Sequence, residues 1–328
     1  ALILICFASV SFAYAQNKSL PQVKLNFEKN VFGFNENIPL QVSISNPDKR
    51  EIKILRWFTP IDGIRGNFFS VTLNDSPVKY LGAVYKRAAP TESDYLILKP
   101  GETIVNTVNL ADYYDLSKSG NYQITYRAES YNLFTETAVF QQKAERLESK
   151  SVSVWIYGTA KKTSLNTSNN DYTTTGCNAE QTAALPAATN GARNYAANSY
   201  NYLNIGTVDA RYTTWFGAFD ITRFATARTH FFNIRNLLVA DSYRIACNDS
   251  GCSAGTFAFV FPTDTATHTI YVCDLFWATP TTGTDSKAGT LIHEISHFND
   301  IAATQDYVYG QAAAMSLAAI SPNLAVNN

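Results

Sequence analysis

Residues 289–310, GTLIHEISHFNDIAATQDYVYG, hold the most specific chemical pattern in the chain, His293-Glu294-Ile295-Ser296-His297. On a helix, residues four apart lie on the same face, so both imidazoles can bind one zinc ion. Glu294 begins beside that metal and can act as general base on a zinc-bound water, whose pKa zinc brings near 7. The pattern predicts a zinc-dependent peptide hydrolase with His293 and His297 as metal ligands and Glu294 as a catalytic residue.

A bare H-E-x-x-H match also arises by chance. Two observations favour chemistry here. The chain has four histidines, and two of them are in the motif. The motif also lies in an apolar helical setting, formed by Leu291, Ile292, Ile295 and Phe298.

A catalytic zinc needs a third protein ligand. After His297 the chain contains no further His or Glu, and its only acids are Asp300 and Asp306. Asp300 is about 10 Å further along a continuous helix than His293, so it could share the metal only if the helix ended. Asp306 follows residues 302–305, which permit a turn that brings the carboxylate back. We therefore prefer Asp306 and keep Asp300 as the alternative.

Two other functions fit the histidine pair. A structural zinc site would need four protein ligands, and no fourth is evident. A catalytically inactive secreted binding protein of the same fold would have no use for the intact Glu294.

The composition excludes some partners and indicates a compartment. The formal net charge of −1, without a basic patch, argues against nucleic acid and against an anionic membrane as partners. Residues 1–15, an apolar run ending in Ala13-Tyr14-Ala15, read as part of a secretory signal peptide. A buried strand or a short membrane helix is the alternative, but the run is too short to span a bilayer. We expect a secreted, extracellular protein.

The cysteines agree with secretion. Cys6 lies in the predicted signal, which leaves the even set Cys177, Cys247, Cys252 and Cys273. Two disulfides are expected, with three possible connectivities. The alternative is a zinc cluster, but the spacing of Cys247 and Cys252 fits no common zinc knuckle.

Residues 16–157 differ from the rest of the chain in their pattern of apolar and polar residues. Apolar residues alternate with polar ones in several short runs, and turn signals such as Asn46-Pro47-Asp48 separate them. This spacing predicts an antiparallel β-sandwich of immunoglobulin-like type. The alternating runs are at 23–27, 40–44, 69–73, 122–126 and 152–156.

Residues 158–172 are polar and read as a linker, in which Lys161-Lys162 is either a processing site or part of a plain surface loop. Residues 173–328 read as a mainly α, α+β domain. Strands are expected at 256–262 and 269–277. Helices are expected over 178–203, from a cap at Asp220 to Leu238, from Thr284-Asp285 through the motif, and after Gly310.

HEISHF followed by ATQDYVYG resembles the aspzincins, the deuterolysin and peptidyl-Lys metalloendopeptidase family. The resemblance extends over almost all of residues 173–328 through TTGCNAEQTAAL, RYTTWFGAF, AGTFAFVFP and CDLFWATPTTGTDSKAGTLIHE. It implies a zincin-like domain with one Zn²⁺, Asp306 as third ligand, and disulfides Cys177–Cys247 and Cys252–Cys273. It also implies that the Tyr309 phenol stabilises the oxyanion, which is compatible with a donor beside zinc; core packing is the alternative for Tyr309.

Two departures from the family pattern matter. Ala303 stands where the family has Gly, so a positive φ there would strain the turn. The chain also ends at Asn327-Asn328, before the acidic pair that holds the substrate Lys in peptidyl-Lys members. We expect a chain truncated at both ends, and cleavage before Lys is implied by the resemblance alone.

The resemblance further implies a zymogen that acts on proteins or peptides, with residues 16–157 as a propeptide that inhibits the enzyme or aids its folding. Residues 16–176 contain no Cys and no His. A thiolate or imidazole cap on the zinc is therefore excluded. Inhibition would have to use a carboxylate, an amine, a backbone carbonyl or simple occlusion.

Overall fold

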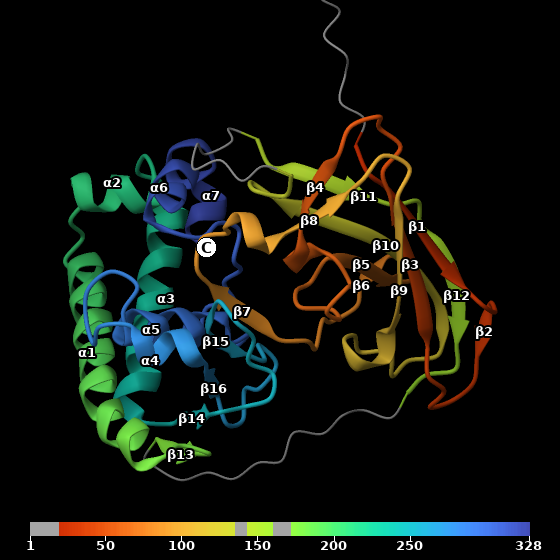
Figure 1. Ribbon diagram of the computed structural model, residues 1–328. Coiled ribbons are helices and arrows are strands. Elements are labelled where there is room, and N and C mark those ends of the chain that lie inside the picture. Colours follow the sequence, from red (N-terminus) through yellow and green to blue (C-terminus); the bar gives the residue numbers. More distant parts are fainter. Residues whose placement is uncertain (1–19, 135–142, 160–171) are drawn as a thin grey trace, which may run out of the picture.

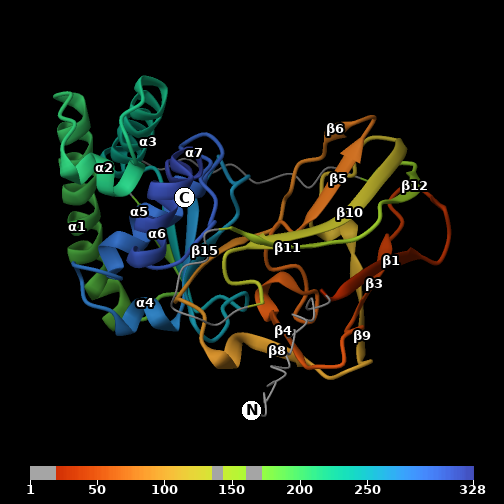
Figure 2. The same ribbon diagram turned by 90° about the horizontal axis from the view of Figure 1, so that it is seen from above.

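The computed structural model describes residues 20–134, 143–159 and 172–328. The predicted signal peptide and Lys161-Lys162 lie outside these ranges. A β-rich part and a helical part lie side by side, with α1 (Ala179–Asn204) on the side away from the β-rich part (Figures 1 and 2).

The β-rich part contains three sheets. A three-stranded antiparallel sheet has the order β1-β3-β9, a six-stranded sheet has the order β2-β12-β10-β5-β6 with β11 also paired to β10, and β4 pairs with β8. The strands are β1 (Gln22–Phe27), β2 (Val31–Phe32), β3 (Pro39–Ser45), β4 (Ile52–Leu55), β5 (Phe69–Leu73), β6 (Ser76–Pro77), β8 (Tyr95–Leu98), β9 (Thr103–Asn109), β10 (Gly120–Ser130), β11 (Glu145–Glu148) and β12 (Val152–Ile156). Short 3₁₀ helices are η1 (Arg56–Phe58), η2 (Glu92–Asp94) and η3 (Leu110–Asp112).

Period-two alternation explains how these strands pack. In β3, Leu40, Val42 and Ile44 are buried and their neighbours are not. They share one core with Ile124 of β10 and Val154 of β12, which belong to the other large sheet. The strands predicted from alternation are thereby confirmed, because each buries its apolar face between the two sheets.

The helical part follows its capping signals. Its helices are α1, α2 (Ala210–Phe216), α3 (Ile221–Ala240), α4 (Asp274–Ala278), α5 (Lys287–His297), α6 (Gln311–Ile320) and α7 (Pro322–Ala325). The Asp220 carboxylate accepts the Arg223 N–H, which confirms the predicted cap of α3. The motif helix begins after Ser286 rather than at Thr284-Asp285, because Asp285 has a left-handed φ of 48°.

The prediction of a strand over 269–277 was wrong in its second half. Strand β16 (Thr269–Val272) ends before Cys273, which is the N-cap of α4. A short apolar run does not distinguish a buried strand from a buried helical turn. The acidic Asp274 in the first turn of α4 suits the helix start.

A five-stranded sheet of order β13-β14-β16-β15-β7 supports the helices. Strands β13 (Thr173–Thr175), β14 (Arg244–Cys247) and β16 are parallel, and β15 (Thr256–Val260) is antiparallel to β16. Helices α1, α3 and α5 share one core with it. The edge strand β7 (Val84–Arg87) comes from the β-rich half of the sequence and pairs antiparallel with β15 (Figure 1).

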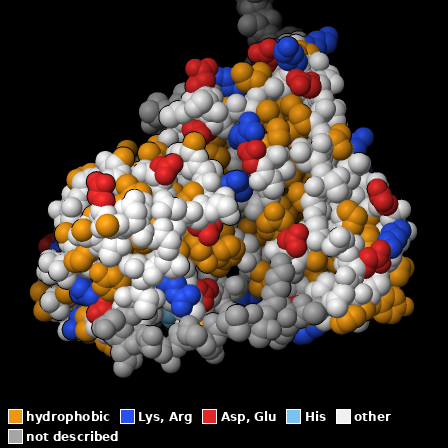
Figure 3. All heavy atoms as spheres, turned by 60° about the horizontal axis from the view of Figure 1, so that its bottom comes forward, with side chains coloured by type: hydrophobic (Ala, Val, Ile, Leu, Met, Phe, Trp, Pro, Cys, Tyr) orange, Lys and Arg blue, Asp and Glu red, His pale blue; other side chains and the backbone are white. Residues whose placement is uncertain are grey.

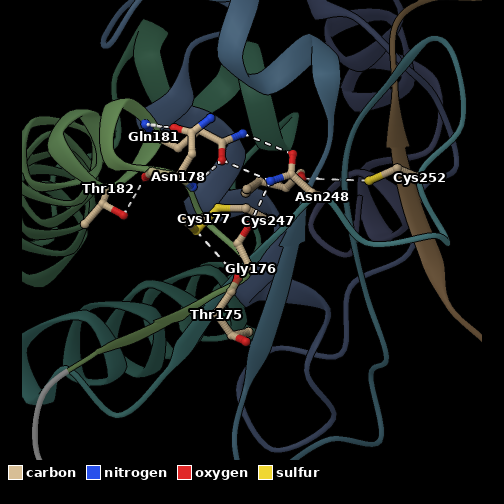
Figure 4. The surroundings of a disulfide bond; sticks show 10 residues. Thr175, Gly176, Cys177, Asn178, Gln181, Thr182, Cys247, Asn248 and Cys252 are labelled. Atoms are coloured by element: carbon tan, nitrogen blue, oxygen red, sulfur yellow. Dashed lines mark hydrogen bonds between the residues drawn. A yellow bond between two sulfur atoms is a disulfide. The ribbon is translucent and has the colours of Figure 1, made fainter.

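Two disulfides tie the helical part together, Cys177–Cys247 and Cys252–Cys273, as the family resemblance implied. The first joins the start of α1 to the end of β14 (Figure 4). Gly176 makes this approach possible, since its φ is 69° and a Cβ there would lie 2.5 Å from the Cys247 carbonyl oxygen. Asn248 donates to the Gly176 carbonyl oxygen over 2.7 Å and closes the same junction.

Acidic and basic side chains are interspersed over the face shown in Figure 3. This pattern agrees with the net charge of −1. Among the described residues, no helix combines the length and apolar character that crossing a membrane requires.

Replacing Cys177 and Cys247 together by Ser removes a link that spans 70 residues of sequence. We expect the free energy of unfolding to fall by about 4 kcal/mol, because the crosslink restricts the unfolded chain. The double replacement at Cys252 and Cys273 should cost less, about 3 kcal/mol, since its loop is shorter. Chemical denaturation under non-reducing conditions measures both values, and the reverse order would contradict this account.

Candidate metal centre

The motif helix α5 presents two imidazoles at its C-terminal end. Leu291 and Ile295 are fully buried in the core of the helical part and fix the rotation of the helix. His293 and His297 project from the other side, and their Nε2 atoms lie 3.0 Å apart. The predicted convergence of the two rings is present.

A tight turn after α5 returns the chain to these imidazoles. The helix ends at Phe298, Ala303 adopts a φ of 52°, and the Thr304 N–H donates to the Ser296 carbonyl oxygen over 3.1 Å. Asp306 then places Oδ1 3.2 Å from Nε2 of His293 and 3.5 Å from Nε2 of His297. The positive φ anticipated for Ala303 is observed.

The arrangement fits a metal ion. His293, His297 and Asp306 form a group whose ligand atoms could hold one ion. Their three atoms lie 3.0, 3.2 and 3.5 Å apart. Tetrahedral zinc with bonds of about 2.0–2.1 Å separates its ligands by about 3.3 Å, so the triangle has the right size.

Thr304 orients His297 and was missed by the sequence reasoning, although the Gly-Thr step of the family pattern contained the signal. The Thr304 carbonyl oxygen lies 2.9 Å from His297 Nδ1, so the N–H at Nδ1 donates to it and Nε2 is left free to bind metal. The Thr304 hydroxyl lies 3.1 Å from the same nitrogen and 2.6 Å from the Ser296 hydroxyl. Thr304 thus fixes the ring and the turn together.

Glu294 is fully buried, and neither carboxylate oxygen has a hydrogen-bond partner in the described structure. Burial raises the pKa of Glu294 well above its usual value, and the Asp306 charge adds to the effect while Lys86 opposes it. A buried carboxylate without a partner is costly unless a cation or water satisfies it. The position suits a group that exchanges a proton.

The surroundings of His293 and Asp306 favour the protonation states that bind a metal, a neutral imidazole and an ionised carboxylate. Burial lowers the pKa of His293 to about 4, and the Lys86 charge acts in the same direction, so the imidazole is neutral at pH 7. Burial alone would raise the pKa of Asp306, but His293 and His297 hold it well below its usual value.

Tyr309 lies at the edge of the metal centre, where its hydroxyl is 3.4 Å from Oδ2 of Asp306. Burial, followed by the Asp306 charge, raises the pKa of the phenol, which therefore stays protonated. The hydroxyl also lies 3.3 Å from the Tyr85 carbonyl oxygen, and the Trp57 ring contacts the phenol edge-on at 5.5 Å. Both of these neighbours belong to the β-rich half of the sequence.

Asp300, the alternative third ligand, is occupied elsewhere. Its carboxylate lies 3.0 Å from Nε2 of His268, so the structure keeps it away from His293 and His297. A cavity of about 390 Å³ lies where the two parts of the molecule meet, and Arg87, Asp306 and Tyr309 are among its lining residues.

Comparison with known proteins identifies the class of this site. A sequence profile of the aspzincin M35 family, described as lysine-specific metallo-endopeptidase, matches residues 201–328. An extracellular protease of Aeromonas hydrophila is 33% identical over 91% of this chain and 87% of its own length. A peptidyl-Lys metalloendopeptidase of Grifola frondosa is 32% identical over 99% of this chain and 94% of its own length. A solved zinc peptidase from Grifola frondosa is 45% identical, covers 46% of this chain and 91% of its own, and has a TM-score of 0.43.

The family model and these relatives identify the class as a zinc-dependent metalloendopeptidase, and the helices, the mixed sheet and the His-His-Asp group give it an α+β fold with a candidate metal site. The chain belongs to the aspzincin family, as its similarity to these relatives over most of its length shows. It acts on protein or peptide substrates, and the alternative of an inactive binding protein is not favoured.

Replacing Ala303 by Gly should stabilise the protein by about 0.5–1 kcal/mol, because an L-residue is strained at positive φ and Gly is not. The matched control is Ala302→Gly, at the neighbouring position, because Ala302 is not among the residues with a positive φ. It should lower the free energy of unfolding by a similar amount. Denaturant titration of both variants tests the sign, and equal effects would refute strain at Ala303.

Replacing Thr304 by Val removes the hydroxyl beside His297 and Ser296 but keeps the backbone carbonyl. We expect zinc affinity to fall about tenfold, the lower end of the range for groups that orient a metal-binding histidine. Competition with a chromophoric chelator measures the affinity. Thr290→Val, on the motif helix α5, is the control, since its buried hydroxyl has no hydrogen-bond partner among the described residues. A similar loss of affinity in both variants would count against orientation.

Proposed function

We propose that this chain cleaves peptide bonds on the N-terminal side of Lys, at a zinc ion held by His293, His297 and Asp306. One observation carries the assignment. Three ligand atoms lie 3.0–3.5 Å apart, and the buried carboxylate of Glu294 next to them has no partner. A carboxylate in that position would serve as the base of the reaction.

Zinc, when bound, acts as a Lewis acid on the scissile carbonyl and makes hydroxide available at neutral pH. The chain's own residues move the protons. Glu294 takes a proton from the attacking water and later delivers it to the leaving amine. Burial raises the pKa of Glu294 above its usual value, which favours the uptake of a proton from the attacking water.

Tyr309 would stabilise the oxyanion. The hydroxyl lies beside Asp306, and its raised pKa keeps it a donor throughout the reaction. A preorganised donor is most useful where negative charge develops, as on the carbonyl oxygen in the tetrahedral state.

The preference for Lys rests on the comparisons. The family is described as lysine-specific, and the Grifola frondosa relative is named a peptidyl-Lys metalloendopeptidase.

The β-rich half would be an immunoglobulin-like propeptide over 16–157, with a linker and processing site at 158–172 and the catalytic domain at 173–328. The two largest hydrophobic cores, one in each part, support this division, and two smaller clusters join the parts. Trp57 and the Tyr85 carbonyl contact Tyr309, which supports inhibition by occlusion of the site. Two disulfides and the relative named extracellular protease support secretion.

The proposed activity is tested by incubating the processed protein with a peptide library, with and without a zinc chelator. We expect cuts before Lys that disappear with the chelator and return when zinc is restored. Cuts that persist in the chelator would argue against a metal-dependent reaction, and cuts at other residues would argue against the Lys preference alone.

Glu294→Gln should lower kcat by about 10²–10⁴-fold, the usual contribution of general acid–base catalysis. Zinc content should stay at one ion per chain, because the three ligands remain. Steady-state kinetics and metal analysis of the same sample separate the two effects. Glu180→Gln, an exposed change in the first turn of α1, is the matched control and should behave as the unmodified protein. Full activity of Glu294→Gln would contradict its role.

A further inference from the structure

Strand β7 of the β-rich half reaches the proposed active site, where the Tyr85 carbonyl oxygen lies 3.3 Å from the Tyr309 hydroxyl. It pairs antiparallel with β15 at the edge of the sheet, with Tyr85 opposite Phe259 and Lys86 opposite Ala258. One more bond, from the Ala88 N–H to the Gly255 carbonyl oxygen over 3.4 Å, continues the pairing. An extended peptide that adds a strand to an exposed sheet edge is a common mode of peptide recognition.

The Tyr85 carbonyl group occupies a defined position in the site. Its oxygen accepts the hydrogen bond of the Tyr309 hydroxyl over 3.3 Å. Tyr309 is the residue proposed to donate to the carbonyl oxygen of the bond being cleaved. The peptide bond that contains this carbonyl joins Tyr85 to Lys86, so a Lys follows directly.

Lys86 lies on the catalytic side of the strand. Residues directly opposite in an antiparallel pair point to the same face, and its partner Ala258 is buried in the core that α5 shares. The Lys86 charge acts on His293, Glu294 and Asp306. Its ammonium lies 5.5 Å from the centre of the Phe257 ring.

Arg87 holds the strand from the other side. It is 8% exposed, and its guanidinium lies 5.0 Å from the Trp57 ring centre and 4.8 Å from that of Tyr85. Trp57 therefore packs on Arg87, directly after Lys86, so strand β7 is held by the β-rich half as well as by its pairing with β15.

We propose that residues 84–87 occupy the substrate cleft as a built-in substrate mimic, with the Tyr85–Lys86 bond at the position of the bond to be cleaved. The inference rests on the proposed function and deepens it, since it names the inhibitory segment and the register in which it binds. Lys86 stands where the Lys of a substrate would stand. Strand β7 brings the Lys86 amine and the Tyr85 backbone carbonyl to the site. An amine and a carbonyl are two of the groups that remain for inhibition when Cys and His are absent.

The first test measures access to the cleft in the full chain, zinc-loaded and carrying Glu294→Gln so that it cannot cut itself. The probe is a fluorescein-labelled peptide with the sequence of residues 83–88, followed by fluorescence anisotropy. Adding Lys86→Ser should tighten binding about tenfold, because the apparent affinity rises in proportion to the fraction of chains whose cleft is open, and losing Lys86 raises that fraction. The matched control is Lys99→Ser, an exposed Lys on the turn between β8 and β9, which should leave binding unchanged.

Equal binding of the peptide to the Lys86→Ser and Lys99→Ser chains would overturn the proposal, as would binding to neither. Thermal melting of each variant shows whether Lys86→Ser is folded. If it is not, Lys86→Gln replaces it and carries the same expectation. Hydrolysis of library peptides by the processed protein separates failure of this proposal from failure of the proposed function. If the processed protein cuts the library while the binding test fails, only the substrate-mimic proposal is wrong.

The second test needs no substitution. A synthetic peptide of residues 80–91 is added to the processed protein with zinc, because the proposal closes the cleft of the full chain, and its products are identified by mass spectrometry. Hydrolysis should add water across the Tyr85 carbonyl carbon and the Lys86 nitrogen, which yields peptides 80–85 with a new carboxylate and 86–91 with a new amine. A cut at another bond, or an intact peptide under conditions where other Lys peptides are cut, would overturn the register.

Discussion

The Nε2 atoms of His293 and His297 and Oδ1 of Asp306 are held 3.0–3.5 Å apart. The core and the turn of the helical part keep them at these distances. Two imidazole nitrogens and a carboxylate oxygen so close together, beside a buried unpartnered Glu294, need a cation to offset their desolvation. The core behind α5 fixes the helix, and the turn through Ala303 and Thr304 fixes Asp306. Thr304 serves both, because its backbone closes the turn while its carbonyl oxygen selects the tautomer of His297.

The proposed metal ligands come from one short segment of the chain, whereas the residues that contact Tyr309 come from distant segments. Nearly all contacts among the proposed ligands lie within residues 293–306. Tyr309, three residues further on, meets Trp57 and the Tyr85 carbonyl from more than two hundred residues earlier. The metal-binding group can therefore form within one short segment, while the residues that contact Tyr309 depend on long-range packing.

Sequence reasoning predicted the local features well. Alternation located the strands that bury one face, the Asp220 cap located α3, and the gap of four residues placed both imidazoles on one side of α5. The pairing of β7 with β15 could not be predicted, because Val-Tyr-Lys-Arg carries no alternation and its partner is far away in sequence. The start of α5 was displaced by the left-handed Asp285, and the strand expected through Cys273 became helix α4. In both cases the deciding interaction was a backbone conformation or a tertiary contact, and neither leaves a periodic signal.

Strand β7 has a second physical role at the sheet edge. The backbone groups of β15 on that side would be unsatisfied without it, and an uncovered edge strand is a template for pairing with other chains. While β7 is paired, this edge is closed to self-association through β15. If β7 left the sheet, the hydrogen-bonding groups of β15 would become available, and an incoming polypeptide could complete the sheet in its place.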